Sequence, residues 1–333
     1  MSWYPLCRSA DLKKGQIIRQ EAFGMPLAVF RTRQNRVGAM YAQCAHMGAD
    51  LSRGQIVGER LQCPLHHWEY NTCGHCEHIP GHASIPARAR QIALRCEEHY
   101  GLVFVFWGDG PMFDFPHFPG LNAAVWSKAF VAQFDAPYQV LIANAFDEQH
   151  FAPIHQRELL EPPSLTTASP YHLCIQFKAR VAGKRASDQF MRALGVKVVE
   201  ISINCWGGNT LLIYNNRSTS YILATLLPIS GAQSRVFITT VTADRGGNAV
   251  ARLARQVILG IAHSLTLAFL KPDIAVLQGL EFLPGVLLPD ADRTFIEWVK
   301  YWKALPAFSV PANLKPSLQQ NAPAKSSEYV ENI

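Results

Sequence analysis

The sequence predicts an α+β protein, and three observations support this fold class. Residues 3–110 consist of short apolar runs separated by Gly and Pro, which is typical of a small antiparallel β domain. The Pro- and Gly-rich segment 108–122 follows and indicates a linker. Further strand-like runs then precede a long helical stretch at 250–282, which favours an antiparallel sheet wrapped on helices.

Domain boundaries follow from these patterns. We expect a first domain at 1–112, a second at 113–310, and a polar, Pro-containing disordered tail at 311–333. Within the second domain we expect a helix near 138–160. Strands are expected over the alternating apolar runs at 171–181, 197–206, 209–216, 220–229 and 234–244.

Composition excludes several classes of protein. The chain has 333 residues, of which 49% are hydrophobic and 17% charged, as in folded globular proteins. The net charge of +6 comes from scattered Lys and Arg residues, so we expect no nucleic-acid partner. The most apolar stretch, 256–270, is shorter than the roughly 20 residues that span a bilayer, so we expect a buried helix and no membrane span.

The cysteines indicate the compartment. The N-terminal segment MSWYPLCRSADLKKG lacks the apolar core of a signal peptide. Eight cysteines without an export signal favour reduced thiols and metal ligands over disulfides. We therefore expect a cytoplasmic protein.

Two Cys-His pairs form the first candidate site. Cys44 and His46 are separated by one residue, and Cys63 and His66 by two. Two thiolates and two imidazoles suit either tetrahedral zinc or a Rieske [2Fe–2S] cluster, in which one iron takes two cysteines and the other two histidines. A zinc finger groups Cys with Cys and His with His, so the order found here favours the cluster, with structural zinc as the alternative.

The segment ANAFDEQHFAPIHQREL forms the second candidate site. Asn144, Asp147, His150 and His155 follow the pattern N-x-x-D-x-x-H-x-x-x-x-H. On a helix, Asp147 and His150 would share one face, and Pro153 would end or bend that helix. Two histidines and a carboxylate make the facial triad of non-haem iron(II) oxygenases. By itself the pair is more typical of histidines with a structural role.

Together the two motifs resemble the α subunit of the Rieske non-haem iron oxygenases. The first motif resembles the signature C-x-H…C-P-x-H-x-W, and the likeness covers about residues 3–305. Quinol-oxidising Rieske proteins carry two further cysteines, whose positions hold Ala49 and Leu65 here, so the chain is more similar to the ferredoxin and oxygenase branch. His67 departs from the family, which more often has Gly or Tyr. The length and His spacing resemble single-subunit-type monooxygenases and demethylases.

The resemblance implies a fold and a set of ligands. It implies an all-β Rieske domain followed by a catalytic domain of helix-grip or START-like form. The cluster ligands would be the four residues of the first motif. The iron ligands would be His150, His155 and a late carboxylate, for which Asp273 in KPDIAVLQGLE matches the family and Glu281 is the alternative.

The resemblance also implies partners. Asp147 would bridge the two metal sites across a head-to-tail homotrimer, and Asn144 would support the iron site. Electrons from NAD(P)H would arrive through a ferredoxin, a flavin reductase or both, and O2 would oxidise a hydrophobic aromatic or polycyclic substrate.

Two alternatives remain from the sequence. The chain could be a Rieske electron-transfer or regulatory protein without oxygenase chemistry, although the complete second motif argues against this. Cys73 and Cys76 could form half of a second metal site, although the match to the family turn G-x-C-x-x-I-P favours a structural Cys76.

Overall fold

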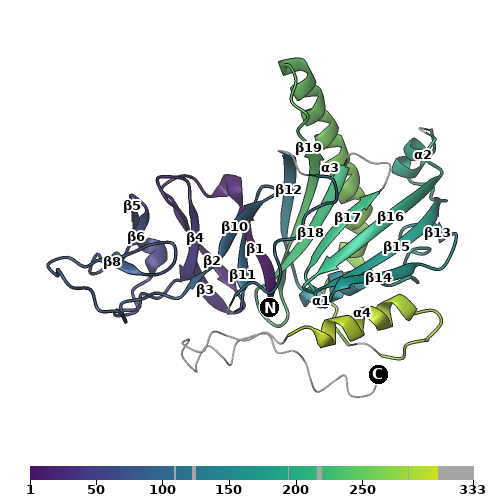
Figure 1. Ribbon diagram of the computed structural model, residues 1–333. Helices are drawn as coiled ribbons and strands as arrows, with labels where there is room; N and C mark the ends of the chain where they lie inside the picture. The colour runs from purple at the N-terminus through teal and green to yellow at the C-terminus, as the bar shows by residue number, and fades with distance from the viewer. Residues whose placement is uncertain (109, 122–124, 194, 216–219, 284, 307–333) are drawn as a thin grey trace. The chain divides into compact units, whose positions relative to one another are not determined.

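The computed structural model describes residues 1–108, 110–121, 125–193, 195–215, 220–283 and 285–306 (Figure 1). The tail predicted at 311–333 lies outside these residues. The described chain forms two compact units. The first comprises Met1–Met112 with the short segment Leu227–Gly231, and the second begins at Phe113.

The first unit is built from antiparallel strands in three small sheets, ordered β1-β11-β10, β2-β3-β4-β9 and β5-β6-β7-β8. Every residue of β11, LVFVFW, is buried, because this apolar strand lies between β1 and β10 in its sheet. The elements are β1 (Ser2–Arg8), η1 (Ser9–Asp11), β2 (Ile17–Ala22), β3 (Met25–Arg31), β4 (Val37–Tyr41), η2 (Leu51–Arg53), β5 (Gln55–Val57), β6 (Arg60–Gln62), β7 (Glu69–Tyr70), β8 (Cys76–His78), β9 (Ala93–Leu94), β10 (Cys96–His99) and β11 (Leu102–Trp107).

The second unit is an eight-stranded antiparallel sheet with four helices. The strand order is β12-β19-β18-β17-β16-β15-β13, with β14 also paired to β15. The strands are β12 (Val125–Phe134), β13 (Arg157–Leu159), β14 (Ser164–Ser169), β15 (His172–Val181), β16 (Val198–Trp206), β17 (Thr210–Asn215), β18 (Ser220–Pro228) and β19 (Ser234–Ala243). The helices are α1 (Tyr138–Asn144), α2 (Ala186–Ala193), α3 (Ala249–Leu277) and α4 (Arg293–Ala304).

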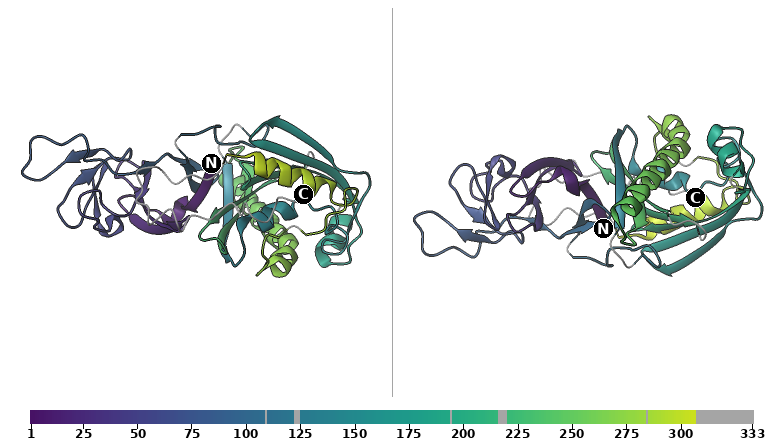
Figure 2. Two further views of the ribbon diagram at one scale, coloured as in Figure 1. Left: turned by 90° about the horizontal axis from the view of Figure 1, so that it is seen from below. Right: turned by 90° about the horizontal axis from the view of Figure 1, so that it is seen from above.

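The sheet of the second unit curves around its helices (Figure 2). Helix α3 packs on β12 and β19, α4 packs on β15, and α1 contacts both helices. The buried indoles of Trp298 and Trp302 fix α4 in the core, with ring centroids 6.1 Å apart. The α+β class and the sheet-on-helix arrangement agree with the sequence prediction.

Several predicted elements differ from the structure. The five expected strands are present as β15 to β19, but β12, β13, β14, α2 and α4 had no predicted counterpart. The helix expected at 138–160 is wrong, since α1 ends at Asn144. The Asp147 carboxylate accepts a hydrogen bond from the Gln149 amide at 2.9 Å, and such side-chain-to-backbone bonds compete with helix formation.

Helix α3 is more exposed than expected. Of its residues only Leu259, His263, Thr266 and Asp273 are buried. By length and hydropathy it is long and apolar enough to cross a membrane, a test that helices of soluble proteins also pass. The segment expected to be a linker differs in the opposite direction. Its residues Phe115 and Phe118 are buried.

Candidate metal centres

Two loops of the first unit bring the Cys-His pairs together. The residues between β4 and η2 carry Cys44 and His46, and those between β6 and β7 carry Cys63 and His66. Both cysteines are buried, and the two thiols lie close enough to interact electrostatically. Both histidines are exposed, with ring centroids 4.8 Å apart. The loops therefore present two thiols at their base and two imidazoles at their rim.

The two loops share one backbone design. The Gly48 amide donates to the Cys44 carbonyl at 2.8 Å, and the His67 amide donates to the Cys63 carbonyl at 3.2 Å. Each donor has a positive φ, +76° at Gly48 and +58° at His67. Because the left-handed region favours glycine, His67 occupies a position that suits Gly better. This backbone conformation accounts for the Gly that the family more often has at this position, and His67 adopts the same conformation with a side chain.

The surroundings of the Cys44 and Cys63 thiols suit ligands on the buried side of an iron–sulfur cluster. The Tyr70 hydroxyl lies 3.2 Å from the Cys44 sulfur, and burial raises the pKa of both groups. The His46 ring stacks on Trp68 with centroids 4.4 Å apart and an interplanar angle of 6°. Two adjacent thiols and two neighbouring imidazoles, each pair on its own side, are the donor set of a Rieske cluster.

Cys73 and Cys76 lie outside the two loops that carry the Cys-His pairs. Cys73 is exposed. Cys76 is buried in the core of the unit, where its thiol donates to the His78 carbonyl at 3.4 Å. This placement favours a structural Cys76.

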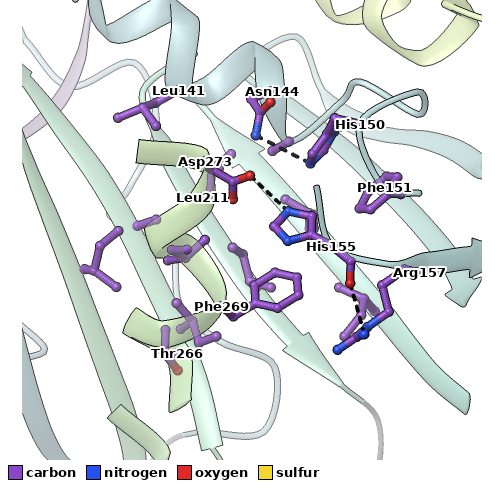
Figure 3. A pocket seen from close by; sticks show the side chains of 18 of the residues that line it. Leu141, Asn144, His150, Phe151, His155, Arg157, Leu211, Thr266, Phe269 and Asp273 are labelled. Carbon is purple, nitrogen blue, oxygen red and sulfur yellow. Dashed lines mark hydrogen bonds and ion pairs between the residues drawn. The ribbon is translucent and has the colours of Figure 1, made fainter. Parts of the chain in front are cut away.

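The second motif and Asp273 meet in the second unit (Figure 3). One ligand atom each from His150, His155 and Asp273 lies within 4.8 Å of the others. The two histidines come from the turns after α1, whereas Asp273 comes from the buried face of α3. Glu281, the alternative carboxylate, lies exposed beyond the end of α3 and outside this group.

His150 is held in a defined orientation. Its Nδ1 atom donates to the Asp147 carbonyl at 2.6 Å, which leaves Nε2 with a lone pair. Burial, followed by the nearby His155, lowers the pKa of His150, and its neutral form is the one that binds metal. The Asn144 amide nitrogen lies 3.5 Å from His150 Nε2, so Asn144 contacts one member of the group.

His155 and Asp273 carry the observation that best fits a metal. His155 is 3% exposed and Asp273 5% exposed, and His155 Nε2 lies 3.1 Å from Asp273 Oδ1. In the part of the chain that the structure describes, His155 Nδ1 is buried without a hydrogen-bond partner, and Asp273 Oδ1 has no partner apart from the His155 imidazole. Buried polar atoms are costly without a partner, so two histidines and a carboxylate with such atoms fit an iron(II) facial triad.

Asp147 lies beside the group but is not part of it. Its carboxylate is 3.7 Å from His150 Nδ1, and its side chain remains 31% exposed. The exposed carboxylate leaves room for a second partner at this edge of the site.

A cavity of about 370 Å³ adjoins the three residues. Its walls come from the sheet, α1 and α3 and are mostly apolar. Representative residues are Leu141, Phe177, Ile203, Leu211, Val236 and Ile238. A concave, largely apolar site with a few convergent polar groups is the usual form of a small-molecule pocket.

Sequence reasoning missed the residues that support His155. The Phe269 ring stacks on the His155 imidazole, with centroids 4.1 Å apart and an interplanar angle of 10°. The Arg157 guanidinium donates to the His155 carbonyl at 3.1 Å and lies 5.7 Å from the Phe269 centroid. Arg157 and Phe269 belong to no motif, so only their position in the fold identifies them.

The chain is similar in part to several known proteins. Residues 2–99 match the Rieske [2Fe-2S] domain family. The chain is 33% identical to the aminopyrrolnitrin oxygenase PrnD of Pseudomonas fluorescens, over 46% of this chain and 45% of that protein. It is also 33% identical to the methylxanthine N1-demethylase NdmA of Pseudomonas putida, over 48% of each chain. The chain spans about half the length of the curated relatives it matches.

Solved structures extend the likeness of the fold to nearly the whole chain. Dicamba monooxygenase bound to 3,6-dichlorosalicylic acid superposes with a TM-score of 0.72 over 91% of this chain and 96% of that chain, at 19% identity. The first unit is therefore a Rieske [2Fe–2S] domain. Over the matched segments the chain is similar to proteins named as an oxygenase and a demethylase, and dicamba monooxygenase shares its fold.

Proposed function

We propose that this chain is the oxygenase component of a Rieske monooxygenase that hydroxylates or oxidatively demethylates a hydrophobic substrate. The observation that carries the proposal is the convergence of His150, His155 and Asp273 beside an apolar cavity, in a chain that also has a Rieske domain. When bound, a [2Fe–2S] cluster would supply single electrons and an iron(II) ion would supply a site for activating O2.

The chain's own residues prepare this chemistry. The Asp147 carbonyl holds the ring of His150, and Phe269 holds the ring of His155 by stacking. Such supporting contacts fix the orientation of ligands. The apolar walls exclude water from the reacting face of the triad, which limits side reactions.

The substrate would occupy the cavity. Its volume of about 370 Å³ and its apolar walls suit an aromatic or polycyclic molecule. Relatives with oxygenase and demethylase names support both hydroxylation and oxidative demethylation as outcomes.

Electrons would enter at the exposed rim of the first unit. NAD(P)H would be oxidised by a separate flavin reductase, which would pass electrons directly or through a ferredoxin. Exposed Arg88 and Arg90 line a groove together with His46, and this positive charge favours an acidic electron carrier by steering its approach.

The Asp147 carboxylate supports a trimeric arrangement. We propose a head-to-tail homotrimer in which the exposed carboxylate bridges the iron site to the Rieske site of the next subunit. We further propose a cytoplasmic location, which the eight unpaired thiols favour. We propose no membrane span, because α3 packs on the sheet and contributes Asp273. No nucleic-acid partner is proposed.

An electron-transfer or regulatory protein is the alternative function. It would need the cluster alone and would have no use for a buried triad beside a cavity. The buried Nδ1 atom of His155, which has no hydrogen-bond partner among the described residues, therefore favours the oxygenase.

Metal analysis tests the proposal directly. Anaerobically purified protein should contain two irons and two acid-labile sulfides for the cluster and one further iron for the triad, with zinc near zero. Two irons that do not rise after addition of iron(II) would support the electron-transfer alternative. Zinc without sulfide would contradict both functions.

A further inference from the structure

One residue of the cavity wall, Arg157, is positively charged, and a buried carboxylate balances its charge. Arg157 at the start of β13 is among the lining residues and is 7% exposed. Its Nη2 atom lies 2.6 Å from Oδ1 of Asp188 on α2, and Asp188 is 2% exposed. Arg157 in the cavity wall and Asp188 next to it therefore form a buried pair of opposite charges.

The second terminal nitrogen of Arg157 is also engaged. Nη1 donates to the His155 carbonyl at 3.1 Å, and it lies 3.5 Å from the Gln156 carbonyl. The guanidinium faces the ring of Phe269, another wall residue. Both terminal nitrogens of Arg157 are therefore held by acceptors within the protein.

The other polar wall groups are also used within the protein. The Thr266 hydroxyl donates to the Ala262 carbonyl at 3.0 Å, and the Asn144 amide contacts His150. His150, His155 and Asp273 form the triad. Among the described residues, Arg157 is the only cavity-lining Lys or Arg.

We propose that Asp188, by pairing with Arg157, keeps this cavity selective for uncharged substrates. A carboxylate that enters would lose its hydration, and it would find the nearby cation already paired. An uncharged apolar molecule loses little on entry and gains contact with the walls. Asp188 is therefore a specificity-determining residue, although it acts through Arg157. This inference rests on the proposed function, because it takes the cavity as the substrate site.

Two probes of matched shape test the inference. 2-Acetylnaphthalene is uncharged, and 2-naphthoate differs from it by one carboxylate in place of the acetyl group. Binding to the metal-loaded protein is measured anaerobically by isothermal titration calorimetry. We expect the wild type to bind 2-acetylnaphthalene at least tenfold more tightly. Equal or tighter binding of 2-naphthoate would overturn the proposal.

Substitution of Asp188 isolates the role of the pair. Asp188→Asn keeps the shape of the side chain but frees the charge of Arg157. The preference for the uncharged probe should then fall at least tenfold, through tighter binding of 2-naphthoate. The iron content of every protein is measured, so that binding of the probes is compared at equal metal loading. An unchanged preference in folded Asp188→Asn would overturn the proposal.

A double variant keeps the test decisive if Asp188→Asn does not fold. Replacing both partners with Leu removes the charges together, which buried pairs often tolerate. The preference should stay within threefold of the wild type, because the native pair is electrically silent. A larger loss of 2-naphthoate binding would mean that wild-type Arg157 serves anions, and the proposal would be wrong.

The matched control is the exposed pair of Arg180 with Glu158, whose side chains are 56% and 57% exposed. Glu158→Gln should leave the preference unchanged. Failure of both probes to bind the wild type would overturn the ligand class alone. The proposed function would still stand or fall on the separate iron and sulfide analysis.

Discussion

The two candidate metal sites use histidine in opposite surroundings. In the Rieske domain His46 and His66 lie exposed, and beside them Met47 is 68% exposed and Leu65 55% exposed. In the second unit His155 and Asp273 are almost fully buried and adjoin an apolar cavity. An exposed rim lets an electron donor approach closely, whereas a buried triad keeps water from a reacting substrate. The difference in burial therefore matches a division between electron entry and oxidation.

Removing one ligand from each site should separate them most sharply. The sites lie in different units and share no ligand, so each variant should lose only its own metal. His150→Ala should retain the cluster's absorbance, lose the third iron and form no detectable product. Cys44→Ser should lose the cluster and its sulfide but still take up one iron(II). Iron, sulfide and visible absorbance are the measurements.

The outcome that contradicts this separation is specific. Loss of the cluster in His150→Ala would mean that the two sites are not independent. As a control, His172→Gln alters a histidine that contacts Asn204 on the sheet, and it should keep both metals.

The bridge proposed for Asp147 should show a smaller effect. Asp147→Ala should keep both metals but slow product formation by about 10- to 100-fold, the usual cost of losing a group that supports a metal ligand. The rate is measured in single-turnover experiments with the cluster reduced beforehand. An unchanged rate would remove Asp147 from electron transfer between the sites.

The exposed groove beside His46 predicts that binding of an electron carrier depends on charge. Arg88→Glu with Arg90→Glu should raise the KM for an acidic ferredoxin by about tenfold and weaken its salt dependence, because rim charges act mainly on association. Reduction by dithionite should be unchanged. Arg180→Glu in the second unit is the control and should leave the KM for ferredoxin unaltered. An equal effect of both variants would argue against docking at this groove.

The smallest effect is predicted for the two loops of the Rieske domain. His67→Gly should raise the free energy of unfolding by up to about 1 kcal/mol, because it relieves a left-handed backbone. Gly48→Ala should lower it by a similar amount, since φ is +76° and no atom lies within 4 Å of the added Cβ. Thermal unfolding of both variants is the measurement. Shifts of the same sign would show that the side chains, and not the backbone, decide stability here.

The sequence by itself determined the features that depend on neighbouring residues. The alternation of apolar residues specified β15 to β19, since a strand's period is local. The order of Cys44, His46, Cys63 and His66 identified the cluster, because each loop must supply one ligand of each type. The family match over residues 2–99 agrees with that prediction.

Only the tertiary structure decided contacts between distant segments. Sequence reasoning preferred Asp273 and kept Glu281 as the alternative. The packing of α3 turns Asp273 towards the two histidines, while Glu281 lies exposed beyond the helix end. The early end of α1 and the pairing of Arg157 with Asp188 were likewise unpredictable. Such contacts depend on how the sheet and helices pack, and no local spacing in the chain encodes that geometry.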